Sequence, residues 1–275
     1  MSFNTIMVQL HLDGAAESQL EFAYGIAHQF DADLIAFAAA ETRMIVSAGD
    51  SGIVAAEALR LQVEEIEARL KVVEGVFHRV TADSPRASWR GYLGDPTRLL
   101  SLHARAADLI IVSSPGPGTT SDHNRTVDEG ALILSAGRPI LLASDDLAPV
   151  RHESVVIAWK DTREARRAVV DAMPFLTRAQ HVLVLTIDED EERAARESAD
   201  DVVLFLNKHG VKARSEVMDV GRSQACEALA QAAGEVGANL IVSGGYGHSR
   251  LREWAFGGLT RSLLQTGSLH RLLSN

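Results

Sequence analysis

The residues best suited to chemistry are a set of glycines in the second half of the chain. Within SGGYGHSRLREWAFGGLTRSLL (243–264), two residues separate Gly244 from Gly247, and nine more separate Gly247 from the pair Gly257 and Gly258. Glycines let backbone N–H groups approach and surround an anion, and the start of a following helix adds a favourable dipole. We therefore interpret this segment as a phosphate-binding loop.

Polar side chains stand among these glycines. His248, Ser249 and Arg250 lie in the middle of the loop, and Thr260 and Arg261 lie near its end. Guanidinium, hydroxyl and imidazole groups all donate hydrogen bonds to phosphate oxygens. Two alternatives remain open: a solvated loop histidine at position 248, and glycines that only form a tight turn and allow a helix to pack closely on a sheet.

The elements that would hold this loop occur twice in the chain. AADLIIVSSPG (106–116) matches GANLIVSGGYG (237–247), and RPILLASD (138–145) matches HRLLSN (270–275) at the same spacing of 131 residues. In both copies a strand-like apolar run leads into a turn of small residues. Repetition of whole units in this way indicates two tandem domains rather than one large domain.

Each half alternates strand-like segments with helix-like segments, which implies a parallel sheet covered on both faces. The joint falls within the polar segment SDDLAPVRHE (144–153), so we predict domains at 1–146 and 152–275. The predicted fold is α/β, with two tandem repeats of a five-stranded, open, parallel-sheet domain of the Rossmann-like type. The predicted strands are 4–11, 33–40, 77–82, 108–113 and 139–143, then 154–159, 181–187, 211–218, 239–243 and 269–273.

Two elements carry further information. Apolar residues recur over 53–74 at intervals of four and three, which indicates a helix. The segment 139–144 is apolar throughout and is interpreted as a buried strand. His270 and Arg271 in the last strand are instead interpreted as residues of a sheet edge.

The glycine spacing, placed after the fourth strand, resembles the universal stress protein family, whose ATP-binding members carry G-x2-G-x9-G followed by Ser or Thr. Gly94-Asp95-Pro96 before the third helix of the first half matches the family as well, and the resemblance covers nearly the whole chain, twice. Gly258 departs from the pattern, because the family has a hydroxyl residue there. Thr260 is the candidate replacement.

The resemblance implies a protein of stress response or regulation that binds ATP, ADP or AMP, with or without Mg²⁺, in its second domain. It also implies a homodimer and at most slow ATP hydrolysis. The alternative is a dimeric interaction scaffold of the same family that binds no nucleotide. The candidate nucleotide-binding residues are Asp161, Gly244, Gly247, His248, Ser249, Arg250, Gly257, Gly258, Thr260 and Arg261.

Asp161 enters this set because it falls, to within one residue, on the family's acidic position that contacts adenine at the end of the first strand. Lys160 is the alternative occupant of that position. A purely structural interpretation is that Asp161 caps a helix beginning at Thr162, with Glu164 completing a pair that resembles a capping box. Asp13 occupies the similar position in the first half.

The first half has lost the glycine pattern. Its aligned residues read Ser113-x2-Gly116-x9-Thr126-Val127, and prolines at positions 115 and 117 remove two amide donors. The charged residues of 117–130 sum to −2, whereas those of 248–261 sum to +2. A triphosphate is therefore expected only in the second half.

Composition excludes several classes of protein. The formal net charge of −10 argues against general nucleic-acid binding, since phosphates would be repelled. No run approaches the about 18 apolar residues of a membrane span, and no secretion signal is visible, so a cytoplasmic location is expected. Cys226 is the only cysteine and is interpreted as a core residue. The P-loop and G-x-S-x-G patterns are absent, and no metal-ligand spacing or catalytic base is visible, so we do not expect an enzyme.

Overall fold

The computed structural model describes residues 2–43, 52–113, 122, 124–187, 192–219, 225–245 and 267–275. The chain divides into two compact units, each described here by itself. The N-terminal unit is Asn4–Ala136, and the C-terminal unit is Gly137–Asn275 together with the first residues of the chain through Phe3. Among the described helices, none is both long and apolar enough to cross a membrane.

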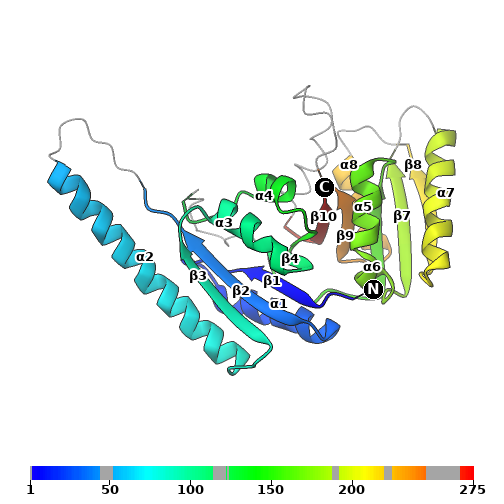
Figure 1. Cartoon of the computed structure of the whole chain (residues 1–275). Helices are drawn as coiled ribbons and strands as arrows, with labels where there is room; N and C mark the ends of the chain where they lie inside the picture. The colour runs from blue at the N-terminus through cyan, green and yellow to red at the C-terminus, as the bar shows by residue number, and fades with distance from the viewer. Residues whose placement is uncertain are drawn as a thin grey trace. The chain divides into compact units, whose positions relative to one another are not determined.

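The N-terminal unit contains four parallel strands in the order β3-β2-β1-β4. Helices α1 and α2 cover one face of these strands, and α3 and α4 cover the other (Figure 1). Connections that run first to one side and then to the other make this the doubly wound topology. The strands are β1 (Thr5–Gln9), β2 (Asp33–Ala40), β3 (Ala87–Leu93) and β4 (Leu109–Val112); the helices are α1 (Ala16–Phe30), α2 (Gly52–Thr81), α3 (Pro96–His103), η1 (Ala104–Ala106) and α4 (Glu129–Ser135).

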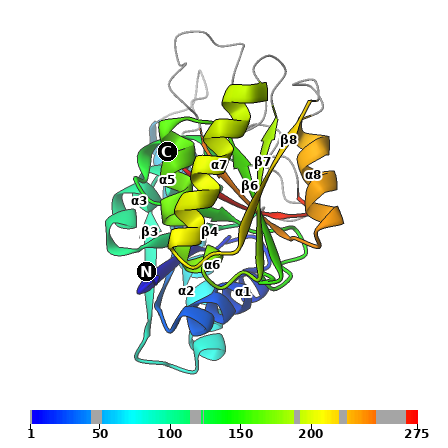
Figure 2. The same ribbon diagram turned by 90° about the vertical axis from the view of Figure 1, so that its right-hand side faces the viewer.

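The C-terminal unit repeats this order as β8-β7-β6-β9-β10, again with parallel pairs, and adds β5 beside β10. Helices α5 and α7 lie on one face and α8 lies on the other (Figure 2). The strands are β5 (Ile140–Leu142), β6 (Ser154–Trp159), β7 (His181–Ile187), β8 (Ala213–Met218), β9 (Leu240–Gly244) and β10 (His270–Ser274); the helices are α5 (Arg163–Asp171), α6 (Met173–Leu176), α7 (Glu192–Lys208) and α8 (Ala225–Glu235).

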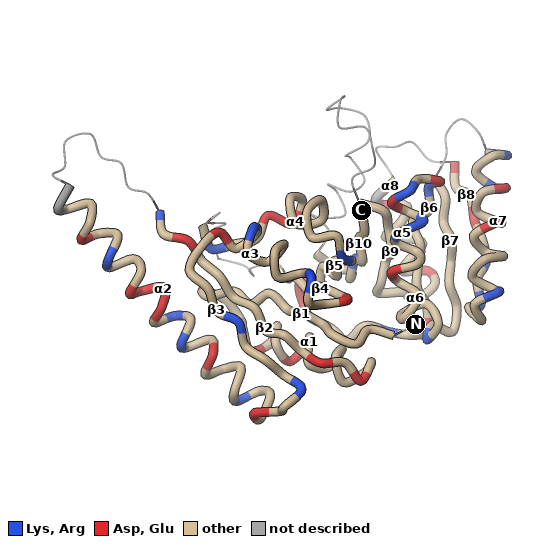
Figure 3. The backbone as a smooth tube through the Cα atoms, viewed as in Figure 1, with Lys and Arg blue, Asp and Glu red and all other residues tan. Residues whose placement is uncertain are grey.

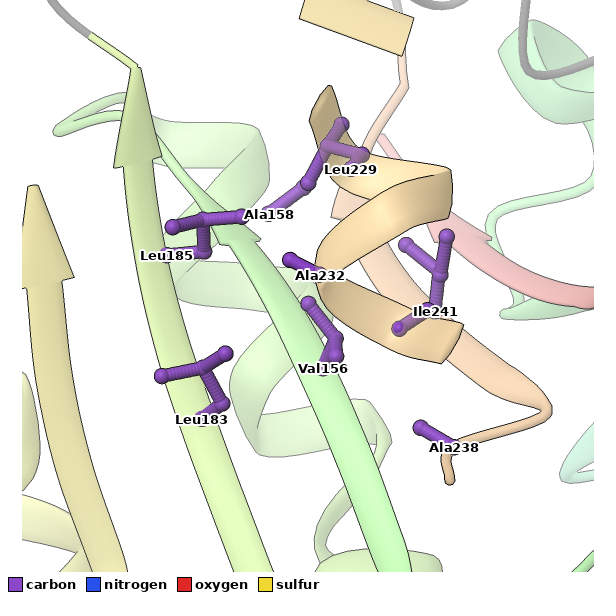
Figure 4. Close-up of a cluster of buried hydrophobic side chains, with 9 residues drawn as sticks. Val156, Ala158, Leu183, Leu185, Leu229, Ala232, Ala238 and Ile241 are labelled. Atoms are coloured by element: carbon purple, nitrogen blue, oxygen red, sulfur yellow. The ribbon is translucent and has the colours of Figure 1, made fainter. Parts of the chain in front are cut away.

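The core between the C-terminal sheet and α8 follows directly from the period-two pattern of the strands. Alternate residues of β6, β7 and β9 point to the same face and meet the alanine-rich side of α8 (Figure 4). The small alanines of the helix allow its backbone to approach the sheet closely, and the larger apolar side chains of this layer come mainly from the strands. The buried cluster is Val156, Ala158, Leu183, Leu185, Leu229, Ala232, Ala233, Ala238 and Ile241.

The α/β class and the alternation of parallel strands with helices are confirmed, but the predicted strand at 77–82 is wrong. That segment is the end of α2, which continues to Thr81. Val73 and Phe77 are both buried, so the apolar spacing of the helix continues four residues further, and the Thr81 hydroxyl donates to the Phe77 carbonyl. The third strand lies instead at Ala87–Leu93.

The interpretation of the last strand as an edge is also wrong. His270 and Arg271 are both buried, at 0% and 2% exposure. β10 lies between β9, with which it is parallel, and β5, with which it is antiparallel through the pair Arg271 and Leu142. The last strands of the two sequence repeats therefore pair with each other inside one compact unit.

Candidate functional site

The predicted site of the second repeat begins where β6 and β9 lie side by side. These are the first and fourth strands of the repeat, and they pair in parallel with Ala158 opposite Ser243. Chain connections leave in opposite directions from this point, and ligands of such sheets bind at the carboxyl ends of the strands there. The structure thus brings together the segment after β6, which contains Asp161, and the start of the glycine loop at Gly244.

Gly244 is packed against the first turn of α5. A Cβ atom at this position would lie 2.6 Å from the backbone nitrogen of Ala165 and 2.8 Å from the carbonyl carbon of Glu164. Both neighbours are backbone atoms, so the strand reaches the helix only because residue 244 has no side chain. This contact supplies the packing role that the sequence left open for this glycine, and it fixes the N-terminus of α5 beside the loop.

The backbone immediately after Gly244 is held by the end of β10. The Gly245 N–H donates to the Ser274 carbonyl at 2.8 Å, and the Asn275 side-chain amide donates to the Gly245 carbonyl at 2.8 Å. Both backbone polar groups of Gly245 are therefore used by the sheet. The backbone at Gly245, where the predicted loop begins, is thus held in place by the end of the chain.

Asp161 lies on the exposed side of the same edge, with its side chain 50% exposed. Its Oδ1 atom accepts hydrogen bonds from Arg166 Nε at 2.8 Å and Nη2 at 2.6 Å. The capping interpretation of Asp161 is wrong, because Thr162 is the N-cap and its hydroxyl accepts from the Ala165 N–H at 3.2 Å. Lys160, the alternative residue at this position, is exposed next to Asp161.

The sequence indicated Glu164 only as part of a capping pair and did not predict that its carboxylate is buried. Glu164 is only 2% exposed, and its Oε1 contacts Arg163 Nη2 at 3.2 Å. An acidic residue in the first turn of a helix is common because it complements the helix dipole. Such a residue gives no sign, before the fold is known, that it will be buried beside a glycine loop.

The other predicted nucleotide-binding residues lie outside the described part of the chain. They are Gly247, His248, Ser249, Arg250, Gly257, Gly258, Thr260 and Arg261.

The equivalent edge of the first repeat is built differently. His11, near the end of β1, is buried and its Nε2–H donates to the Ser113 carbonyl just after β4 at 2.8 Å. The His11 backbone N–H donates to the Gln19 side chain at 3.1 Å. Burial lowers the pKa of His11. The bond to Ser113 and the nearby charge of Asp13 oppose this shift only in part. A neutral imidazole thus joins the two strand ends.

Asp13, the counterpart of Asp161, is engaged by two arginines. Arg125 Nη1 lies 3.0 Å from its Oδ2, and Arg69 Nη1 lies 2.5 Å from its Oδ1. Asp13 is 28% exposed, compared with 50% for Asp161. The counterpart of Asp161 is therefore paired with two arginines of its own repeat, whereas Asp161 meets Arg166 alone among the described residues.

A separate hollow of about 330 Å³ lies at the amino ends of β6, β7 and β8. Its lining includes Ser154, His181 and Lys212, with Val236 from the segment after α8. This is the opposite edge of the sheet from the strand ends at Asp161 and Gly244. We therefore place the candidate site at the carboxyl edge, where the topology and the glycine motif coincide.

No protein-family model and no curated protein matches the sequence. Among solved structures, a universal stress protein from Archaeoglobus fulgidus is 13% identical and aligns over 99% of this chain and 96% of its own, with a TM-score of 0.72. This chain has the universal stress protein fold. A putative universal stress protein from Pseudomonas aeruginosa is 15% identical over 99% of this chain and 93% of its own, with a TM-score of 0.60. These alignments span both repeats, so the universal stress protein fold accounts for the tandem arrangement.

Proposed function

We propose that the second repeat binds an adenine nucleotide and that the chain acts as a nucleotide-dependent regulatory protein of the stress response, in the cytoplasm. ATP is the expected ligand, with ADP and AMP as relatives and Mg²⁺ as an optional companion. The first repeat binds no nucleotide. The chain is not an enzyme, apart from at most slow ATP hydrolysis.

The observation that carries this proposal is the difference between the two repeats at the same edge of the same fold. In the first repeat, Asp13 is held by Arg125 and Arg69. In the second, Asp161 is more exposed and meets Arg166, a residue of the helix that directly follows it. Of these two carboxylates Asp161 is the more accessible, and it lies at the edge from which the full glycine pattern departs.

Charge supports the same choice. The segment 248–261 carries a formal +2 and its counterpart 117–130 carries −2. A nucleoside triphosphate is strongly anionic, and at partly exposed separations near 4 Å each unit charge is worth about 1–4 kcal/mol. The N-terminus of α5 beside Gly244 adds a partial positive charge on the same side.

Isothermal titration calorimetry with ATP tests the proposal. Replacing Gly247 with Val puts a side chain where a phosphate must approach, so binding should be lost while the circular dichroism melting curve is kept. The matched variant, Gly116→Val, changes the aligned residue of the first repeat and should leave affinity and a stoichiometry of one nucleotide per chain unchanged. Equal loss in both variants would contradict the assignment to the second repeat.

The alternative function is a dimeric scaffold that binds no nucleotide, and the glycine at position 258 favours it, because the ATP-binding pattern has a hydroxyl there. Failure of the unmodified protein to bind ATP at millimolar nucleotide would select this alternative. Both functions include a homodimer, which is the commonest symmetric assembly. Sedimentation showing a single species near 29.6 kDa at micromolar concentration would contradict the dimer.

A further inference from the structure

Four charged side chains of the first repeat form a closed ring of ion pairs. Arg125 contacts Asp13 at 3.0 Å and Glu65 at 3.1 Å, and Arg69 contacts Asp13 at 2.5 Å and Glu65 at 3.1 Å. Each carboxylate therefore meets two guanidinium groups, and each guanidinium meets two carboxylates. We call this set the Arg125 ring.

The Arg125 ring joins three separate segments of the N-terminal unit. Asp13 follows β1, Glu65 and Arg69 lie on α2, and Arg125 belongs to the segment between β4 and α4. The side chains of Arg125 and Asp13 are 20% and 28% exposed, whereas those of Arg69 and Glu65 are 46% and 47% exposed, so dissolved ions reach the α2 side of the ring. The ring thus connects segments that follow the carboxyl ends of β1 and β4, the edge at which ligands of doubly wound sheets bind.

The segment that carries Arg125 is itself built to present it. The N–H groups of Arg125 and Thr126 both donate to the Asp122 carbonyl at 2.8 Å, and the Asp122 side chain accepts from Arg43 Nε at 3.0 Å. The Arg43 contact, an Asn124 bond and the Arg125 charge together lower the pKa of Asp122 against the opposing effect of burial. These bonds fix the turn that carries Arg125 independently of its contacts with α2.

The buried packing of helix α2 begins next to the ring. From Val54 to Glu65, no described side chain of the helix is buried, and Ile66 is the first that is. Val54, Leu59 and Leu61 are about half exposed, at 54%, 46% and 54%. The helix extends beyond the strands of its unit, with charged residues along its length (Figures 1 and 3). On the N-terminal side of the ring, α2 keeps a hydrogen bond from the Arg43 N–H to the Gln62 side chain at 2.7 Å, and no described side chain there is buried.

We propose that the Arg125 ring is a salt-sensitive latch. It holds the middle of α2 to the segments that follow β1 and β4. Because its strength is electrostatic, the latch weakens as the screening length falls from about 8 Å at physiological ionic strength to about 3 Å in 1 M salt. Opening loosens α2 on the N-terminal side of Ile66, while the buried side chains of Ile66, Val73 and Phe77 keep the rest of the helix packed.

Hydrogen exchange followed by mass spectrometry, on the full chain without nucleotide, tests the latch. Peptides covering 59–70 should exchange about five- to tenfold faster in 1 M NaCl than in 0.05 M NaCl. The variant Arg125→Gln should exchange at the fast rate at both salt concentrations. The variant Arg60→Gln is the matched control, since Arg60 pairs only with Glu57 and Glu64 of the same helix among the described residues.

Exchange in Arg125→Gln within twofold of the unmodified chain, or equal acceleration in Arg60→Gln, would overturn the latch. Unchanged exchange in peptides from β1 and β2 verifies that Arg125→Gln remains folded; if those peptides accelerate too, the ring is a general stabilising contact and the latch is overturned. Arg125→Gln should also leave ATP binding by the second repeat unchanged. The exchange readout needs no ligand, so the latch and the proposed nucleotide function can fail separately.

Discussion

Gly244→Ala is the change whose cost the structure defines most directly. The added Cβ would lie 2.6 Å from the Ala165 nitrogen, whereas an ordinary contact is 3.4 Å or more. The first turn of α5 must therefore move by most of an ångström away from β9. Overpacking of this kind costs about 1–3 kcal/mol, and here the upper half of the range is expected because backbone, not a flexible side chain, is in the way.

Urea unfolding measures this cost when a fluorophore reports on the C-terminal unit alone. Trp159 at the end of β6 is buried, so a background with Trp89 and Trp254 changed to Phe makes it the sole reporter. With an m-value of about 2–3 kcal/mol per molar, a loss of about 2 kcal/mol lowers the midpoint by about 0.7–1 M. ATP affinity should fall as well, because the N-terminus of α5 is displaced.

The control is Gly234→Ala in α8, where a Cβ meets nothing within 4 Å. Alanine is the better helix former, so this change should raise the free energy of unfolding by about 0.5–1 kcal/mol. If Gly244→Ala unfolds at the same urea concentration as the parent protein, the close approach of β9 to α5 is not a real constraint, and the packing argument fails.

Two further outcomes are expected. Thr162→Ala should lower the free energy of unfolding by about 1 kcal/mol through loss of the helix cap, whereas Asp161→Ala should lower it by less than about 0.5 kcal/mol in the same urea assay; the reverse order would contradict the capping assignment. Burial, opposed by the bond to the Ala148 carbonyl, lowers the pKa of His270 from 6.5 to about 4. The neutral ring therefore stabilises the fold fully above pH 6.5. This contribution of about 3 kcal/mol to the free energy of unfolding is lost as the pH falls to about 4. His270→Gln should flatten this part of the pH profile of unfolding; an unchanged slope would rule out His270 as its source.

The neutral state of His270 has a structural reason. Its Nδ1 accepts a hydrogen bond from the Ser144 N–H at 3.0 Å, while Nε2–H donates to the Ala148 carbonyl at 2.8 Å. Protonation at Nδ1 would set two N–H groups against each other in a buried site. Burial and the bond from the Ser144 N–H thus both favour the neutral ring.

Local sequence pattern was sufficient to predict those strands whose apolar residues are almost all buried in the sheet. β6 and β7 were predicted with the bounds that the structure has, because unbroken β-branched and apolar runs end at polar residues. The segment 77–82 failed because Val76, Phe77 and Val80 also suit a strand, and only the buried spacing from Ile66 to Phe77 shows the helix continuing.

Long-range pairing was beyond the sequence. His270 and Arg271 are polar, and their sequence neighbourhood does not show that β5 covers the other side of β10. In the same way the local charge of 117–130 indicated a lost phosphate site, but not that Arg125 pairs with Asp13, 112 residues away in the chain. Sequence pattern therefore predicted the alternation of strands and helices, and not the contacts that distinguish the two repeats.

The pairing of β5 with β10 limits how the chain can be divided. A fragment starting at residue 152 would lack β5, and with it Ser144 and Ala148, which bind the buried His270. It would also lack the Ala143 carbonyl that accepts from Arg271. One side of β10 would then present open backbone groups to solvent, the condition that leads isolated sheets to aggregate or exchange strands. We therefore expect the second sequence repeat not to fold by itself, because the strand next to β10, which is β5, belongs to the first repeat.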